Sequence, residues 1–125
     1  MKRFATLMLG LATLVPAGTA FAGAQVLTTA PAMHIYPTNQ TLYCDIVNVS
    51  TKQINATVEI VDYYGNVTSG PLTQPLPPFN GTALGESVPN SGAYCRFTVD
   101  TSKKGVRGVA VYDNGSTYQM SIPAQ

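Results

Sequence analysis

Apolar and polar residues alternate along two cysteine-containing segments of the chain, residues 42–49 and 93–99. The apolar or cysteine positions are Leu42, Cys44 and Ile46 in the first segment and Ala93, Cys95, Phe97 and Val99 in the second. Because a strand places every second side chain on one face, both segments are predicted to be strands that turn their cysteine inward. The two strands can therefore be joined through the core by one disulfide between Cys44 and Cys95.

Other segments carry the same period of two, and no helical pattern follows residue 22. Residues 54–62 alternate most regularly, with Ile54, Ala56, Val58 and Ile60 on one face. Further strands are predicted at residues 25–29, 82–88, 106–112 and 117–122. The pattern predicts an all-β fold, an antiparallel β-sandwich of six to eight strands. Because the cysteines lie on the second and sixth strands, the predicted sandwich is immunoglobulin-like, with one disulfide across its core.

The connections between these strands carry separate predictions. Residues 63–66 form a turn with Asp62 as its capping residue, and Asn114-Gly115 marks a hairpin. Residues 70–78 contain four prolines and are predicted to cross between the sheets in a polyproline-like conformation. Residues 101–105 are predicted to be a hairpin tip. In the strand that follows, Val109 and Val111 are expected to face inward, although a one-residue shift would reverse this.

The first 22 residues have the features of a signal peptide. Lys2 and Arg3 precede an uncharged apolar run at residues 4–15, and Ala20-Phe21-Ala22 provides the small residues of a cleavage site. We predict that residues 1–22 are removed and that residues 23–125 form a single domain, exported to the periplasm or the extracellular space. No integral membrane segment is expected in the mature chain.

Charge and cysteine content narrow the classes of function. Residues 23–125 hold five basic and six acidic residues, and this balance predicts no binding to nucleic acid or to anionic membranes. Two cysteines in an exported chain predict a disulfide rather than a metal site or a catalytic thiol. No metal and no cofactor is expected.

The segments 44–50 and 92–99, followed by Val106-Arg107, resemble small exported bacterial proteins of an uncharacterised family. The resemblance covers most of the mature chain. It implies an exported single β-sandwich with one disulfide, and it implies no activity, substrate or site residue.

Candidate chemical groups are few. The available bases are His34 and six carboxylates. Because these groups are scattered over turns and exposed strand faces, no catalytic residue is predicted. Lys103, Lys104 and Arg107, with Arg96 nearby, are interpreted as solvated charges protecting a sheet edge, the alternative being an anion or polysaccharide contact. Asn-x-Ser/Thr triplets begin at Asn39, Asn48, Asn55, Asn66, Asn80 and Asn114, and they are interpreted as composition rather than glycan acceptors. Asn48 in particular is predicted to face inward.

Seven tyrosines are many for this length, and Tyr63 and Tyr64 are the candidate ligand contacts. The sequence predicts an exported, non-catalytic domain with a structural or binding role and an unknown partner. A carbohydrate- or small-ligand-binding module that uses exposed tyrosines is the alternative, and a hydrolase with an unrecognised site is the third hypothesis. A monomer is expected, because the chain supplies its own closing strand.

Overall fold

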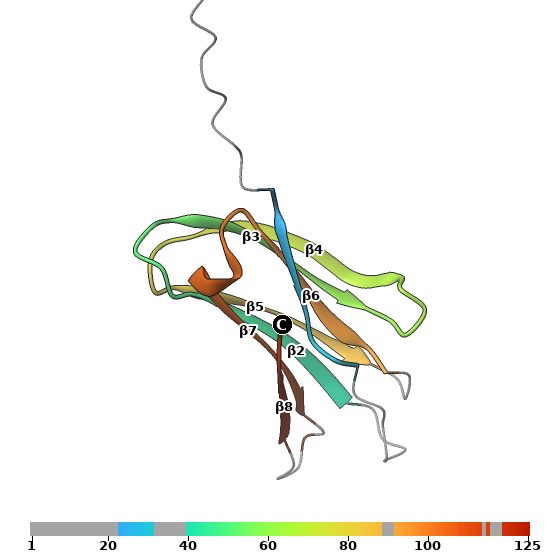
Figure 1. Ribbon diagram of the computed structural model, residues 1–125. Coiled ribbons are helices and arrows are strands. Elements are labelled where there is room, and N and C mark those ends of the chain that lie inside the picture. Colours follow the sequence, from blue (N-terminus) through green and yellow to red (C-terminus); the bar gives the residue numbers. More distant parts are fainter. Residues whose placement is uncertain (1–22, 32–39, 89–91, 114, 116–118) are drawn as a thin grey trace, which may run out of the picture.

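Two antiparallel β-sheets pack face to face in the computed structural model, which describes residues 23–31, 40–88, 92–113, 115 and 119–125 (Figure 1). The elements are β1 (Gln25–Thr28), β2 (Gln40–Asn48), β3 (Ile54–Val61), β4 (Val67–Leu76), β5 (Gly81–Val88), β6 (Tyr94–Val99), the 3₁₀ turn η1 (Lys103–Gly105), β7 (Val106–Asp113) and β8 (Gln119–Pro123). The predicted all-β class is confirmed. Four predicted features lie outside the described residues: the signal peptide, His34, Asn39 and Asn114. Within the described residues, no helix is long and apolar enough to cross a membrane.

The strand order is β1-β6-β3-β4 in the first sheet and β5-β2-β7-β8 in the second. Cys44 on β2 and Cys95 on β6 form the predicted disulfide between interior strands of the two sheets, with their Cα atoms 5.5 Å apart. Both cysteines are fully buried, and the alternating residues predicted around them face the same core. The position of the disulfide matches the bridge of an immunoglobulin domain.

The outer strands are arranged differently from those of an immunoglobulin domain. There the first strand lies beside the second and the last strand beside the sixth. Here β1 pairs with β6, and β7 pairs with β2. The sandwich class is therefore confirmed, whereas the description as immunoglobulin-like stays a prediction based on the disulfide alone.

The prediction of a crossing at residues 70–78 was wrong. Residues 70–76 belong to β4, which pairs with β3 through residues including Leu72 and Pro75, and only the short loop after Leu76 leads to the other sheet. Because β4 is the last strand of its sheet, Pro71 and Pro75 do not interrupt a ladder on its other side. The four prolines excluded a central strand correctly but did not exclude an edge strand.

The prediction of a hairpin tip at residues 101–105 was also wrong. β6 belongs to the first sheet and β7 to the second, so η1 carries the chain across the sandwich. The hairpin between β7 and β8 around Asn114-Gly115 is confirmed by their antiparallel pairing.

The predicted inward positions of Val109 and Val111 were wrong, since β7 has the opposite register. Gly108, Ala110 and Tyr112 face the core, and the two valines are only half-buried on the outer face. A Cβ atom at Gly108 would lie 2.9 Å from the Phe97 ring, so the missing side chain makes room for that ring. Tyr112 fills the remaining space and donates its hydroxyl hydrogen to the buried carbonyl oxygen of Ala93.

Loss of the disulfide should destabilise the fold strongly. The bond joins residues 51 positions apart, and cross-links of this span stabilise by about 2–5 kcal/mol. Cys44→Ala is expected to lower the free energy of unfolding by that amount in urea titrations. Thiol titration of the folded wild-type protein should detect no free sulfhydryl, and two reactive thiols in oxidised protein would contradict the structure.

Candidate functional site

The two ends of the sandwich present different exposed side chains. We call residues 62–66, which join β3 to β4, the tyrosine turn. We call the three loops at the opposite end, residues 49–53, 77–80 and 100–105, together with their flanking residues Val47 and Arg107, the Asn48 end. The two groups lie at opposite ends because β3 begins beside the Asn48 end and finishes at the tyrosine turn (Figure 1).

Asp62 organises the tyrosine turn, as the sequence predicts. Its Oδ1 accepts hydrogen bonds from the backbone N–H groups of Tyr64 at 2.9 Å and Asn66 at 2.8 Å. Its Oδ2 accepts a third from the Asn66 side-chain amide at 3.0 Å. Gly65 has a φ of +90°, which a glycine adopts without steric cost. One carboxylate therefore accepts hydrogen bonds from two residues of the turn, Tyr64 and Asn66.

Tyr63 and Tyr64 project from this turn into solvent, with 64% and 82% of their surfaces exposed. Their ring centroids are 5.8 Å apart and their planes are nearly perpendicular, at 84°. A perpendicular pair offers one ring face and one ring edge rather than a flat platform. Since the turn beneath is fixed by Asp62, a ligand would bind the rings without first ordering the backbone.

The Asn48 end is organised by one buried amide. The Asn48 side chain is fully buried, as its inward position predicts, and its Nδ2 donates to the carbonyl oxygens of Lys52 at 2.7 Å and Leu76 at 2.9 Å. The Pro77 carbonyl oxygen, at 3.2 Å, shares one of these two N–H groups. The Oδ1 atom of Asn48 accepts hydrogen bonds from the backbone N–H and the hydroxyl group of Ser50. Asn48 thus ties the loop after β2 to the end of β4.

Backbone hydrogen bonds bring the other two loops against the same point. The Asn48 N–H donates to the Asn80 carbonyl oxygen at 2.9 Å, and the Val49 N–H donates to that of Gly105, also at 2.9 Å. The turn between β4 and β5 and the turn η1 therefore flank the end of β2 on either side. The hydrogen bonds of this network join residues up to 56 positions apart, and no sequence motif indicates it.

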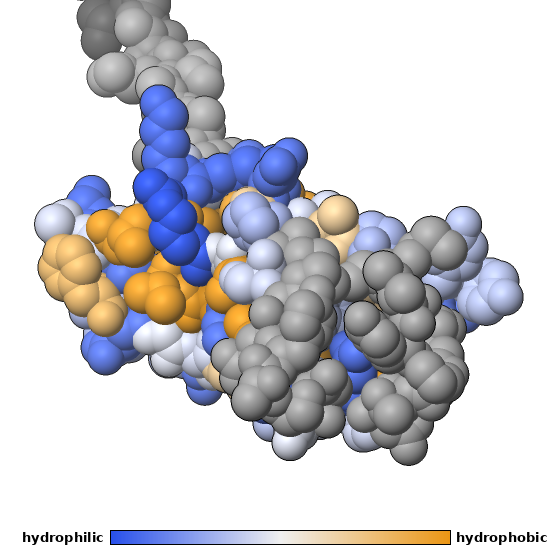
Figure 2. Space-filling view, turned by 90° about the horizontal axis from the view of Figure 1, so that it is seen from below, coloured by the Kyte–Doolittle hydropathy of each residue, from blue (hydrophilic) through white to orange (hydrophobic). Residues whose placement is uncertain are grey.

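Exposed apolar side chains gather at the Asn48 end. Phe79 is 70% exposed, and Val47 and Val49 are 39% and 38% exposed. Phe79 also has a φ of +61°, a left-handed conformation that costs a bulky residue roughly 1–2 kcal/mol. Figure 2 shows hydrophobic surface on the left of this view, the side on which the loops of the Asn48 end lie in Figure 1, with strongly hydrophilic side chains beside it.

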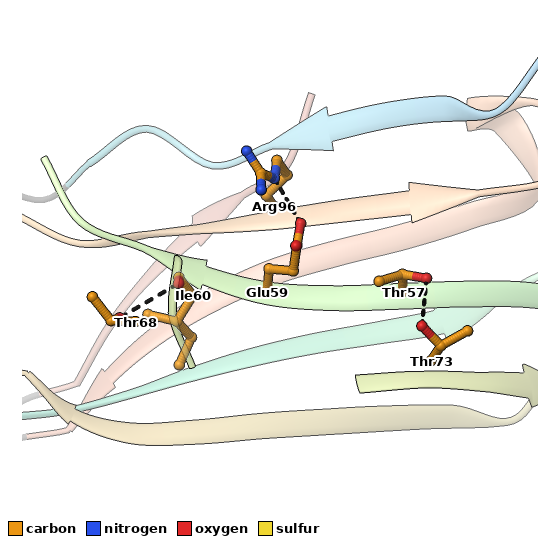
Figure 3. Close-up of polar contacts among 6 residues, drawn as sticks. All are labelled: Thr57, Glu59, Ile60, Thr68, Thr73 and Arg96. Atoms are coloured by element: carbon orange, nitrogen blue, oxygen red, sulfur yellow. Dashed lines mark hydrogen bonds and ion pairs between the residues drawn. The ribbon is translucent and has the colours of Figure 1, made fainter. Parts of the chain in front are cut away.

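Most basic residues lie at the same end. Lys52, Lys103, Lys104 and Arg107 are all exposed there. Arg96, which the sequence placed near this cluster, lies instead on the outer face of the first sheet (Figure 3). It donates from Nε to Glu59 at 2.7 Å, and this hydrogen bond raises the pKa of Arg96.

The described carboxylates do not converge on one another. Five of them accept a hydrogen bond from a neighbouring group: Glu59 from Arg96, Asp62 from Asn66, Glu86 from Thr68, Asp100 from Asn55 and Asp113 from Gly115. Asp45 lies half-buried on the outer face of the second sheet, and burial raises its pKa. Among the described residues no group of three or more His, Cys, Asp or Glu side chains could hold a metal ion.

A groove of about 400 Å³ lies beside the end of β1 and the chain terminus. It is lined by Thr28, Thr29, Ala30, Pro31, Pro123 and Gln125. Among the described residues, no charged or aromatic side chain lines this groove. Comparison with known proteins gives no match, whether with family models, with curated proteins or with solved structures.

The pH dependence of the tyrosine turn should follow the ionisation of Asp62. Hydrogen bonds from Asn66 lower the pKa of Asp62 below its ordinary value of 3.8. The stabilisation is therefore complete above the unfolded-state pKa and is lost as the pH falls through the lower folded-state pKa. NMR titration of the Asp62 carboxyl should give a midpoint below 3.8 that coincides with chemical-shift changes at the Tyr64 and Asn66 amides. A midpoint above that value would contradict the hydrogen-bonded turn.

Removal of the Asn48 amide should destabilise the fold far more than removal of an exposed amide. Asn48→Ala removes the side-chain donor to the buried Leu76 carbonyl oxygen and leaves a cavity where the fully buried amide was, and we expect the free energy of unfolding to fall by about 3 kcal/mol. Asn55→Ala is the control, because it removes a solvent-exposed hydrogen bond to Asp100 and should cost about 1 kcal/mol or less. Equal losses in urea titrations would show that Asn48 does not organise the loops.

Proposed function

We propose that the protein is an exported, non-catalytic binding module whose tyrosine turn contacts a protein partner. The observation that carries the proposal is the exposure of Tyr63 and Tyr64 on a turn fixed by three hydrogen bonds to Asp62. Tyrosine is enriched at the energetically dominant positions of protein interfaces, where the ring is buried and the hydroxyl finds a polar partner. A fixed turn lowers the entropy lost on binding.

Export and the lack of catalysis belong to the same proposal. The signal-peptide pattern of residues 1–22 and the disulfide both fit an oxidising compartment, either the periplasm or the extracellular space. The described carboxylates are bonded to separate neighbours, far from the paired arrangement that hydrolysis by general acid and base needs. A hydrolase remains the third hypothesis.

A carbohydrate is the second candidate ligand, favoured by the 82% exposure of Tyr64. An aromatic ring of this kind can stack on the face of a sugar. The perpendicular orientation of Tyr63, however, allows only one of the two rings to stack on a flat polysaccharide surface. A concave protein surface can enclose both rings, and for this reason the protein partner is preferred.

Photo-crosslinking should test where the partner binds. A p-benzoylphenylalanine residue placed at position 64 is expected to capture a partner from an envelope extract of the native host. The same residue at position 43, an exposed tyrosine on the flat face of the second sheet, should capture little. Tyr63→Ala/Tyr64→Ala should weaken binding of the captured partner by at least about tenfold in calorimetry, as expected for loss of two central aromatic contacts.

Two results would contradict this proposal. Equal crosslinking at positions 43 and 64 would show that the tyrosine turn is not a preferred contact. Binding to a glycan array that the double substitution abolishes, without any captured protein, would transfer the function to the carbohydrate alternative.

A further inference from the structure

We propose that the Asn48 end binds the surface of anionic phospholipid membranes. In this proposal Phe79 enters the interfacial region of the lipid, and Lys52, Lys103, Lys104 and Arg107 contact the headgroups. The inference does not depend on the tyrosine turn, which lies at the other end of the sandwich.

Charge is separated along the long axis of the molecule. Four of the five basic residues in the described part of the chain lie at the Asn48 end, and the fifth, Arg96, is paired with Glu59. The one acidic residue there is Asp100, whose carboxylate accepts hydrogen bonds from the Asn55 backbone N–H and side-chain amide at 2.8 Å each. The opposite end holds Asp62 and Asp113. Residues 23–125 have a net charge of −1 (five basic against six acidic residues), and yet one end of the molecule is basic and can face an anionic surface.

Apolar exposure coincides with this basic end. Phe79, Val47 and Val49 are exposed, and Phe79 keeps its unfavourable positive φ on a turn tied to Asn48. The Phe79 side chain itself, held in solvent in a strained conformation, adds no stability to the fold. Strain of this kind is retained where the surrounding structure fixes it and the residue has a role outside the core.

The combination of apolar and basic groups selects a lipid surface among anionic partners. Lysine and arginine contact the anionic groups of an acidic polysaccharide or a nucleic acid, and a sugar or a base can stack on Phe79, but neither ligand uses the exposed aliphatic side chains of Val47 and Val49. A bilayer interface accepts an aromatic ring at headgroup depth while its anionic lipids attract each nearby cation. A membrane surface uses the aromatic ring, the two valines and the cations of the Asn48 end together.

Vesicle sedimentation should test the proposal with the purified protein. Vesicles of phosphatidylcholine with about 30% phosphatidylglycerol, an anionic fraction that gives a strong negative surface potential, are expected to bind the protein. Vesicles of phosphatidylcholine alone should not bind it, and 0.5 M NaCl, which reduces the screening length to roughly 4 Å, should release it.

Two variants separate the apolar contribution from the charged one. Phe79→Gly removes the ring and its strain together, so it should fold at least as stably as wild type and bind these vesicles about tenfold more weakly. Lys103→Glu/Lys104→Glu should weaken binding by more than about tenfold, since each cation near an anionic surface contributes about fivefold. Tyr64→Ala, which removes an exposed ring at the other end, is the matched control and should bind as wild type.

A fluorescent reporter locates the contact directly, because the chain has no tryptophan. Phe79→Trp should show a blue shift in emission on the anionic vesicles and quenching by brominated lipid, whereas Tyr64→Trp should show neither. The proposal is overturned if the two reporters respond alike or if vesicles with and without phosphatidylglycerol bind equally. It is also overturned if Phe79→Gly binds vesicles as wild type while polygalacturonate displaces the protein completely, which would assign the basic residues to an acidic polysaccharide.

Discussion

The disulfide between Cys44 and Cys95 is the constraint on which the rest of the sandwich depends. It joins β2 to β6, an interior strand of each sheet, and both cysteines are fully buried. The chain is small and charged residues make up only 10% of it, so neither a large core nor extensive ion pairing stabilises the fold. The covalent bond across the core fixes the two sheets relative to each other, independently of the loops at either end.

The position of β2 then determines the structure of the Asn48 end. Asn48 is the last residue of β2 and lies on the same inward face as Cys44, four positions earlier. Its buried amide can therefore reach the carbonyl groups of both Lys52 and Leu76, and its backbone N–H reaches Asn80. The exposure of Phe79 follows from this chain of contacts, since the turn that carries it is bonded to the strand that carries the disulfide.

Features that depend on the local alternation of apolar and polar residues were predicted correctly from the sequence. Features that depend on which sheet a strand joins were not. The inward faces of residues 42–46 and 93–99 were correct because their hydrophobic period is unambiguous, and the Asp62 turn was correct because its hydrogen bonds are local. The register of β7 was wrong because Val109 and Val111 are more apolar than Gly108 and Ala110. The core selects by volume opposite Phe97 rather than by hydrophobicity alone. Tyr63 and Tyr64 could be named from sequence, as could the basic cluster at residues 103–107 and the inward position of Asn48. The assembly of that cluster and Asn48 with Phe79 at one end of the sandwich could not, because it depends on hydrogen bonds between loops far apart in the sequence.

The two proposed surfaces fit together in space. β3 begins at the Asn48 end and leads to the tyrosine turn, and its eight residues at about 3.3 Å each separate the two by roughly 26 Å. A molecule that rests on a membrane through Phe79 and its neighbouring cations would hold Tyr63 and Tyr64 away from the lipid, beyond the roughly 8 Å screening length of physiological salt. Asp62 and Asp113 at that far end would be repelled by an anionic surface, which favours the same orientation. Charge separation along one axis would therefore orient the proposed module, with the Asn48 end on the membrane and the tyrosine turn directed toward the partner.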